Sequence, residues 1–172
     1  MRMRAAAVGT VIFLVLVPGM AAGVIPWLLT HWRGREPPWH PAIRLVGLTL
    51  LAIGAVILAS AFIRFVTEGR GTPAPVAPTE RLVVGGLYRH VRNPMYLAVT
   101  ATIVGQAMIL GRLELLTYAA LFLATTAAFV HLYEEPTLLR RYGTEYEAYR
   151  RAVPGWWPRW HAWEPGMDQR EG

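Results

Sequence analysis

The sequence predicts an all-α integral membrane protein with about four transmembrane helices and a C-terminal amphipathic helix on the cytoplasmic surface. Two uncharged apolar runs, residues 5–30 and 45–63, are each near the ~20 residues that a helix needs to cross a bilayer. Two further apolar runs, 95–110 and 115–130, are separated by a short charged turn, which favours a helical hairpin. With 54% hydrophobic residues, the 172-residue chain is too apolar for an ordinary soluble domain.

The arginines predict the orientation. All 17 basic residues are arginine, and an inside N-terminus places thirteen of them in cytoplasmic segments and four, at positions 33, 35, 44 and 112, outside. By the positive-inside rule this bias favours cytoplasmic termini. It also explains the net charge of +6 without a nucleic-acid partner, and no nucleic-acid-binding motif accompanies the charge. Arginine without lysine, with abundant alanine, glycine and proline, is typical of a GC-rich genome, so we expect a bacterial inner (plasma) membrane.

The first span is expected to be a retained helix, because its apolar run is longer than the ~7–15 residues of a signal-peptide core. Pro18 and Pro26 are expected to kink it, which a membrane helix tolerates when its neighbours bond the freed carbonyls. The following loop holds His31 and His40, but no carboxylate cluster accompanies them, so we expect no metal site. The absence of cysteine excludes disulfides and thiolate ligands.

A polar loop, residues 80–97, follows a proline-rich extended segment and organises the second half of the chain. Its paired glycines at 85 and 86 permit a turn with positive φ, and Asn93-Pro94 breaks the backbone before a new helix. A helix N-terminus leaves backbone N–H groups unpaired, so this turn can hold an anionic or hydrogen-bonding ligand. The alternatives are that the loop's arginines only fix topology, or that Arg92 binds lipid phosphate.

Two carboxylates, Glu134 and Glu135, come directly after the fourth apolar run, at the predicted cytoplasmic end of that helix. They are either a solvated pair or partners for cationic groups of the polar loop, because both segments emerge on the same side. Further on, residues with helical spacing form one face of an amphipathic helix that Pro154 closes: Tyr142, Tyr146, Tyr149 and Val153. Tyr88, Tyr96, Tyr142 and Tyr146 are expected to be interfacial anchors or walls of a pocket for an aromatic or sulfonium group.

Two stretches at a defined separation resemble the isoprenylcysteine carboxyl methyltransferase and phospholipid methyltransferase superfamily of integral membrane enzymes. They are GLYRHVRNPMY at 86–96 and EEPTLLRRYGTEYEAYRRAVP at 134–154. No dinucleotide, P-loop, zinc-protease or serine-hydrolase motif competes with this reading. The resemblance implies residues 1–66 as the first two transmembrane helices and 67–172 as a catalytic, cofactor-binding region.

The resemblance further implies S-adenosylmethionine as cofactor, without a Rossmann domain and without a metal. The helix N-terminus at Asn93 to Tyr96 would meet the methionine end of the cofactor, and Glu134 would hold one of its polar groups. The residues implied to bind the cofactor are, at the adenosine site, Glu80, Leu82, Val83 and Tyr88 and, at the helix start, Asn93, Pro94, Met95 and Tyr96. Catalytic roles would fall to Arg92, Glu135 and His131, the last two as candidate bases for an amine or hydroxyl acceptor.

Three positions depart from the family's usual pattern. Asn93 stands where histidine is usual, so this position keeps a donor but cannot titrate near neutral pH. Val130 stands where the eukaryotic carboxyl methyltransferases carry an arginine thought to meet the substrate carboxylate, which weakens a carboxylate acceptor. Gly155 replaces the arginine of a Val-Pro-Arg sequence.

The expected substrate is therefore a lipophilic small molecule or lipid that enters from the bilayer, with membrane lipids as the other partners. Two competing functions remain. A membrane reductase of the sterol type would bind NADPH in a similar architecture. A non-catalytic membrane scaffold would bind no cofactor.

Overall fold

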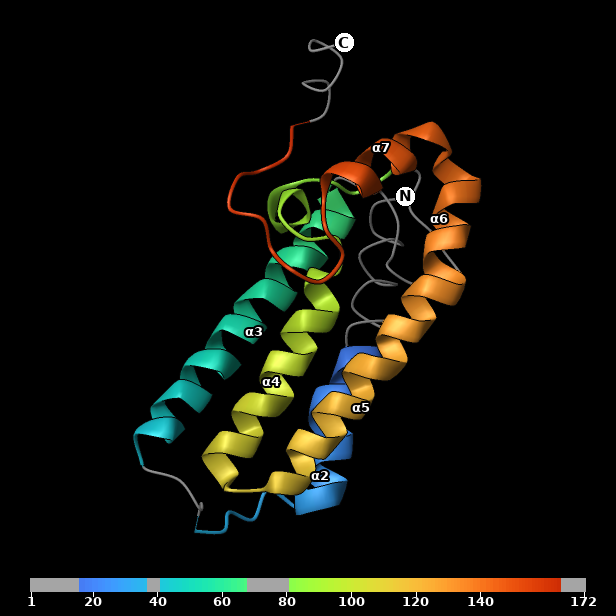
Figure 1. Cartoon of the computed structure of the whole chain (residues 1–172). Coiled ribbons are helices and arrows are strands. Elements are labelled where there is room, and N and C mark those ends of the chain that lie inside the picture. Colours follow the sequence, from blue (N-terminus) through green and yellow to red (C-terminus); the bar gives the residue numbers. More distant parts are fainter. Residues whose placement is uncertain (1–15, 37–40, 68–80, 165–172) are drawn as a thin grey trace.

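The computed structural model describes residues 16–36, 41–67 and 81–164 (Figure 1). Every regular element within these ranges is helical, which confirms the all-α prediction for this part of the chain. In chain order the elements are the π turn η1 (Met20–Val24), α2 (Ile25–Thr30), α3 (Ala42–Thr67), the 3-10 turn η2 (Gly86–Arg89), α4 (Pro94–Leu110), α5 (Leu113–Phe129), the π turn η3 (Val130–Glu134), α6 (Glu135–Tyr142) and α7 (Thr144–Ala152).

The helices form an elongated bundle (Figure 1). The polar loop, α7 and the C-terminal tail gather at one end of it, and we call this end the cap. Helix α4 lies between α3 and α5, α2 packs beside α5, and α7 crosses the end of the bundle near η2. Two helices are long and apolar enough to cross a membrane, Ala42–Arg64 and Leu113–Tyr142. Leu16–Thr30 and Pro94–Leu110 are apolar but shorter, so this criterion finds two spans where the sequence predicts four, and residues 1–15 lie outside the described parts.

Each π turn is followed by a proline in the first turn of the next helix. Pro26 follows η1 and Pro136 follows η3. Proline has no N–H to donate to the carbonyl four residues earlier, and a π turn shifts the pairing by one residue, as when Ile25 N–H bonds Met20 O. The helix therefore continues through the proline with a local change of pitch.

Side chains from neighbouring helices bond the carbonyls that Pro26 and its π turn leave. Gln106 of α4 donates from Nε2 to Ala22 O at 2.7 Å, and the Tyr118 hydroxyl of α5 donates to Ala21 O at 2.9 Å. An unpaired carbonyl in an apolar environment costs several kcal/mol, so these two bonds fix the first helix against α4 and α5. They confirm the expectation that neighbours compensate Pro26.

Glycines set the close approach of α3 and α4. A Cβ placed on Gly105 would lie 2.6 Å from Gly47 O, and one placed on Gly54 would lie 2.8 Å from Ala98 O and collide with the Thr102 hydroxyl. Neither distance is possible for a real Cβ, so the two backbones can touch only because side chains are missing there. Small residues at such contacts are typical of helix pairs in membranes.

Replacing Gly54 with alanine is therefore expected to lower the free energy of unfolding by about 1–3 kcal/mol, because the methyl group pushes α3 away from α4. Gly23→Ala is the matched control, since nothing lies within 4 Å of a Cβ there. Thermal unfolding in detergent measures both variants. Equal melting temperatures would contradict the packing argument.

Candidate functional site

The polar loop turns as its glycines predict and delivers the start of α4 to the cap. Gly86 has φ of 58°, a conformation that favours glycine, and η2 follows it directly. Asn93 is the N-cap of α4 and Pro94 is in its first turn, as predicted. Backbone N–H groups at the start of α4 therefore face the cap, where α6, α7 and the C-terminal tail converge.

Arg92 is the centre of a network that joins four segments of the chain. Its guanidinium donates from Nη1 to Glu135 Oε1 at 2.6 Å and to the Tyr146 hydroxyl at 3.1 Å, and from Nε to Val153 O at 2.9 Å. The Arg92 and Glu135 side chains are 14% and 11% exposed. A charge-assisted pair with little solvent screening is a strong contact, so Arg92 holds the loop, α6, α7 and the tail in one arrangement. This disfavours lipid phosphate as the partner of Arg92.

A second polar pair lies beside the start of α4. The Tyr96 hydroxyl donates to Glu134 Oε2 at 3.0 Å, and the ring of Trp156 lies 6.4 Å from the Tyr96 ring, centroid to centroid. The two predicted carboxylates thus have separate partners, Glu134 with Tyr96 and Glu135 with Arg92. The interpretation of these glutamates as a merely solvated pair is wrong.

Asn93 carries a buried side-chain donor that is unused within the described residues. It is 7% exposed, and its side-chain nitrogen Nδ2 makes no hydrogen bond there. Its backbone N–H donates to Gly155 O at 3.2 Å. A buried amide nitrogen without a partner costs about 1–3 kcal/mol, so a further acceptor at this atom would be stabilising.

Two of the residues expected to line an adenosine site pack against each other. Val83 and Tyr88 are buried in one cluster with Ala61, against which Met95 of the helix start packs, whereas Leu82 packs on the buried face of α7. Glu80 lies outside the described residues. The structure thus brings Leu82, Val83 and Tyr88 to the cap, and their role in cofactor binding stays a prediction.

Tyr88 and Tyr149 tie the loop to α7. Burial raises the pKa of both hydroxyl groups, so each stays protonated at any ordinary pH. The Tyr149 hydroxyl can therefore act as a permanent donor, and it bonds Tyr88 O at 2.7 Å. Tyr88 and Tyr146 are 7% and 2% exposed, so the expectation that they are interfacial anchors is wrong.

His131 is the outermost of the three predicted catalytic residues. Its side chain is 76% exposed, and Nδ1 lies 3.9 Å from Glu135 Oε2. Arg150 approaches the same carboxylate oxygen at 3.8 Å. His31 lies at the other end of the bundle, where it packs against Trp27, and His40 is outside the described residues.

The C-terminal tail wraps around the polar loop, which the sequence analysis missed. Arg89 donates from Nε to Trp163 O at 2.6 Å and pairs with Glu164, and His90 Nδ1 lies 2.9 Å from Arg159 O. Four backbone bonds reinforce these contacts, Arg92 N to Pro154 O, Asn93 N to Gly155 O, Arg159 N to His90 O and Trp163 N to Arg89 O. The clustered cationic side chains of the loop could have predicted this contact, because they can donate hydrogen bonds to the free carbonyls of an irregular segment.

Two boundaries differ from the sequence prediction. The fourth helix does not end before the glutamates but continues through η3 and α6 to Tyr142. The predicted amphipathic helix is then interrupted at Gly143, whose φ of 53° and ψ of −126° lie outside the helical region, and α7 begins at Thr144. The tyrosine face survives this break because α7 carries Tyr146 and Tyr149 on its buried side.

Comparison with known proteins identifies the family of the chain. A model of the phospholipid methyltransferase family matches residues 42–145, which include α3, the polar loop, the α4–α5 hairpin and α6. No curated protein and no solved structure matches the chain. Since the match covers more than half of the chain and contains the Arg92–Glu135 and Tyr96–Glu134 pairs, this protein belongs to the phospholipid methyltransferase family of membrane methyltransferases.

Proposed function

We propose that this protein is an S-adenosylmethionine-dependent methyltransferase that acts on a lipophilic small molecule or lipid. The observation that carries the proposal is the buried Asn93 amide nitrogen at the start of α4, which has no partner among the described residues. A carboxylate, such as that of S-adenosylmethionine, can accept from this nitrogen and lie at the positive end of the helix dipole. The Asn93 donor set therefore fits the methionine end of the cofactor.

Beside Asn93, an anionic and aromatic environment fits the cofactor's positive charge. Glu134 contributes the carboxylate, and the Tyr96 and Trp156 rings lie next to it. Aromatic faces and a poorly solvated carboxylate both attract a cation. When bound, S-adenosylmethionine supplies an electrophilic methyl group on its sulfonium sulfur. The contribution of Asn93, Tyr96 and Glu134 is then to bind and align this group and to exclude water.

The transfer also needs a base when the acceptor is a hydroxyl or an amine, because such an acceptor loses a proton. Glu135 on α6 and His131 on η3 are the candidate bases. Glu135 is already paired with Arg92, so we assign the exposed His131 as the base and Glu135 as the residue that orients it and holds Arg92. Val130, buried in place of the family's arginine, does not favour a carboxylate acceptor.

His131→Ala is accordingly expected to reduce turnover about 10²-fold or more for such an acceptor, without a change in cofactor affinity. His131→Gln keeps the size of the side chain but cannot take the proton, so it should match alanine. Initial rates at saturating cofactor measure the effect. Unchanged turnover in both His131→Ala and Glu135→Ala would exclude a base at this position.

Isothermal calorimetry on the detergent-purified protein tests the proposed cofactor. We expect S-adenosylmethionine and S-adenosylhomocysteine to bind and NADPH not to bind. Binding of NADPH alone would instead indicate the sterol-type reductase, and silence from all three ligands in a folded, lipid-supplemented sample would indicate the scaffold. The family match favours the methyltransferase over both alternatives.

Topology and access complete the proposal. The cap carries Arg89, Arg92 and the arginines of α6 and α7, whereas Arg33 and Arg112 lie at the opposite end, so the positive-inside rule favours a cytoplasmic cap, and we propose a bacterial inner membrane as the location. The cofactor then enters from the cytosol, and the acceptor enters sideways from the bilayer. The division at residues 66 and 67 into a helical pair and a catalytic region stays a prediction.

A further inference from the structure

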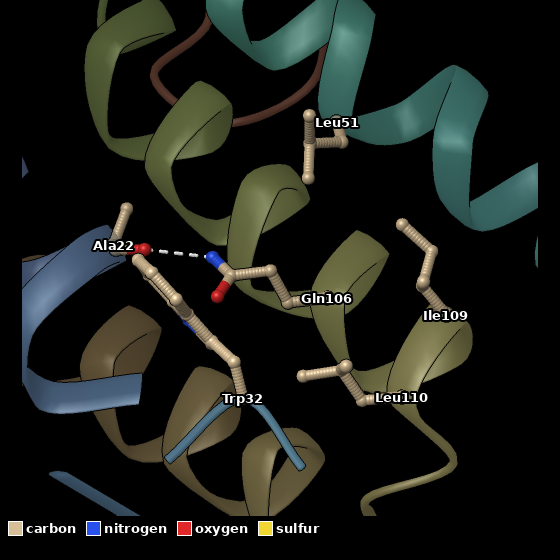
Figure 2. A pocket seen from close by; sticks show the side chains of 6 residues that line it. All are labelled: Ala22, Trp32, Leu51, Gln106, Ile109 and Leu110. Atoms are coloured by element: carbon tan, nitrogen blue, oxygen red, sulfur yellow. Dashed lines mark hydrogen bonds between the residues drawn. The ribbon is translucent and has the colours of Figure 1, made fainter. Parts of the chain in front are cut away.

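An apolar cavity lies at the end of the bundle away from the cap. Its volume is about 310 Å³, and η1, α3, α4 and the chain after α2 line it, leaving it open on one side (Figure 2). Six residues line it, Ala22, Trp32, Leu51, Gln106, Ile109 and Leu110. This volume is at the lower end of the range for small-molecule sites, which are mostly apolar with a few placed polar groups.

Gln106 supplies the polar group of this cavity. Its Nε2 donates to Ala22 O at 2.7 Å, which fixes the orientation of the amide, because a carbonyl can only accept. The side-chain oxygen Oε1 is buried and accepts no hydrogen bond within the described residues, and the residue is 8% exposed. Figure 2 shows this oxygen turned away from Ala22, on the side of the Trp32 indole. One unused acceptor thus lies just beneath the lining of the cavity.

The side chains that line the cavity offer few polar groups, only the Gln106 amide and the Trp32 indole N–H, so most of its space suits apolar atoms. An apolar molecule with a single donor satisfies Oε1 and also fills the space against Leu51, Ile109 and Leu110. The lining therefore selects for a donor on an apolar body and against a charged group.

Trp32 is held as a wall of the cavity by an uncommon backbone. Trp32 and the preceding His31 have φ of 50° and 48°, a region that bulky residues rarely adopt. A bond from Trp32 N–H to Thr30 Oγ1 at 3.1 Å supports this conformation. The indole also borders a second, shallow apolar cavity of about 340 Å³ beside Gly19 and Trp27. Strain of this kind is typical of ligand sites.

We propose that this cavity binds a neutral lipophilic molecule from the bilayer that carries one hydroxyl or N–H donor, with the donor on Gln106 Oε1 and the apolar body between Trp32 and Leu110. The site is separate from the cap, because Gln106 lies ten residues beyond Tyr96 on α4, roughly 15 Å along the helix. Binding here does not depend on the methyl-transfer chemistry.

Fluorescence quenching tests this site in vesicles of dioleoylphosphatidylcholine. The probes are ω-bromoundecanol and its O-methyl ether, which differ only in the donor, and the difference between wild type and Trp32→Phe isolates the Trp32 signal. We expect the alcohol to bind about tenfold more tightly than the ether, as one hydrogen bond to a buried acceptor predicts. In Gln106→Leu the two probes should bind equally.

Leu110→Phe keeps the test decisive if Gln106→Leu does not fold, because it fills the cavity and leaves the amide in place. It should abolish quenching by both probes, whereas Leu121→Phe, the same substitution at an exposed position of α5, should bind as wild type does. Equal affinity for the alcohol and the ether in wild type would overturn the proposal. Undiminished quenching in Leu110→Phe would overturn it as well.

Discussion

Arg92→Ala is expected to lower the free energy of unfolding by about 3–5 kcal/mol, because it leaves the carboxylate of Glu135 buried without its main partner. The Tyr146 hydroxyl and Val153 O lose their donor as well, and Val153 is fully buried. In the same variant we expect methyl transfer to fall roughly a hundredfold or more, since the loop that carries Asn93 is no longer fixed relative to α6.

Thermal unfolding in detergent and initial rates measure these two effects. Arg140→Ala is the matched control, because Arg140 is exposed and donates only to Thr137 of its own helix among the contacts described. Arg92→Lys should fall between the two, since lysine keeps the charge but lacks the planar set of donors. If Arg92→Ala unfolds at the temperature of Arg140→Ala, Arg92 does not hold the cap together.

Tyr96→Phe is expected to weaken binding of S-adenosylmethionine about tenfold to a hundredfold. The change removes the hydroxyl that donates to Glu134 Oε2 at 3.0 Å, so a half-buried carboxylate loses its only described side-chain donor at a loss of about 1–3 kcal/mol. Glu134 is then free to turn away from the position in which it faces the cofactor. Calorimetric titration of the purified variant measures this affinity.

A double-mutant cycle separates this effect from a general loss of structure. Glu134→Gln and Tyr96→Phe should each weaken binding, and the double variant should be little worse than either, because both changes break the same contact. Tyr133→Phe is the control, since Tyr133 is exposed and stacks only on Phe129 among the described rings. Fully additive losses would show that Tyr96 and Glu134 act independently.

Local sequence signals predicted the helices and much of the cap. The three apolar runs within the described parts became α3, α4 and α5 with ends shifted by a few residues, because an apolar run without charge has no stable alternative to a helix in a bilayer. The Asn93-Pro94 start of α4 and the positive φ of Gly86 follow from the restrictions on proline and glycine. The membership of the family followed from two short motifs, and the family match confirms it.

The tertiary structure decides which polar side chains pair with each other. Neither the spacing nor the composition could show that Glu135 pairs with Arg92 while Glu134 pairs with Tyr96, because two adjacent carboxylates on a helix point in directions about 100° apart and meet different neighbours. The continuation of the fourth helix through Pro136 depends on a π turn, which a simple helical period does not predict.

The contacts of the tail and of Gln106 could not be predicted from the sequence either. The tail from Val153 to Glu164 has no regular periodicity, and its bonds to the polar loop join residues more than sixty positions apart, so only the folded chain reveals them. Gln106 reads in the sequence as one polar residue in an apolar helix, and its two roles arise because Pro26 frees a carbonyl on a different helix. Local propensity determined where helices form in this protein. The approach of distant helices determined which polar atoms are satisfied and which, at Asn93 and Gln106, have no partner among the described residues.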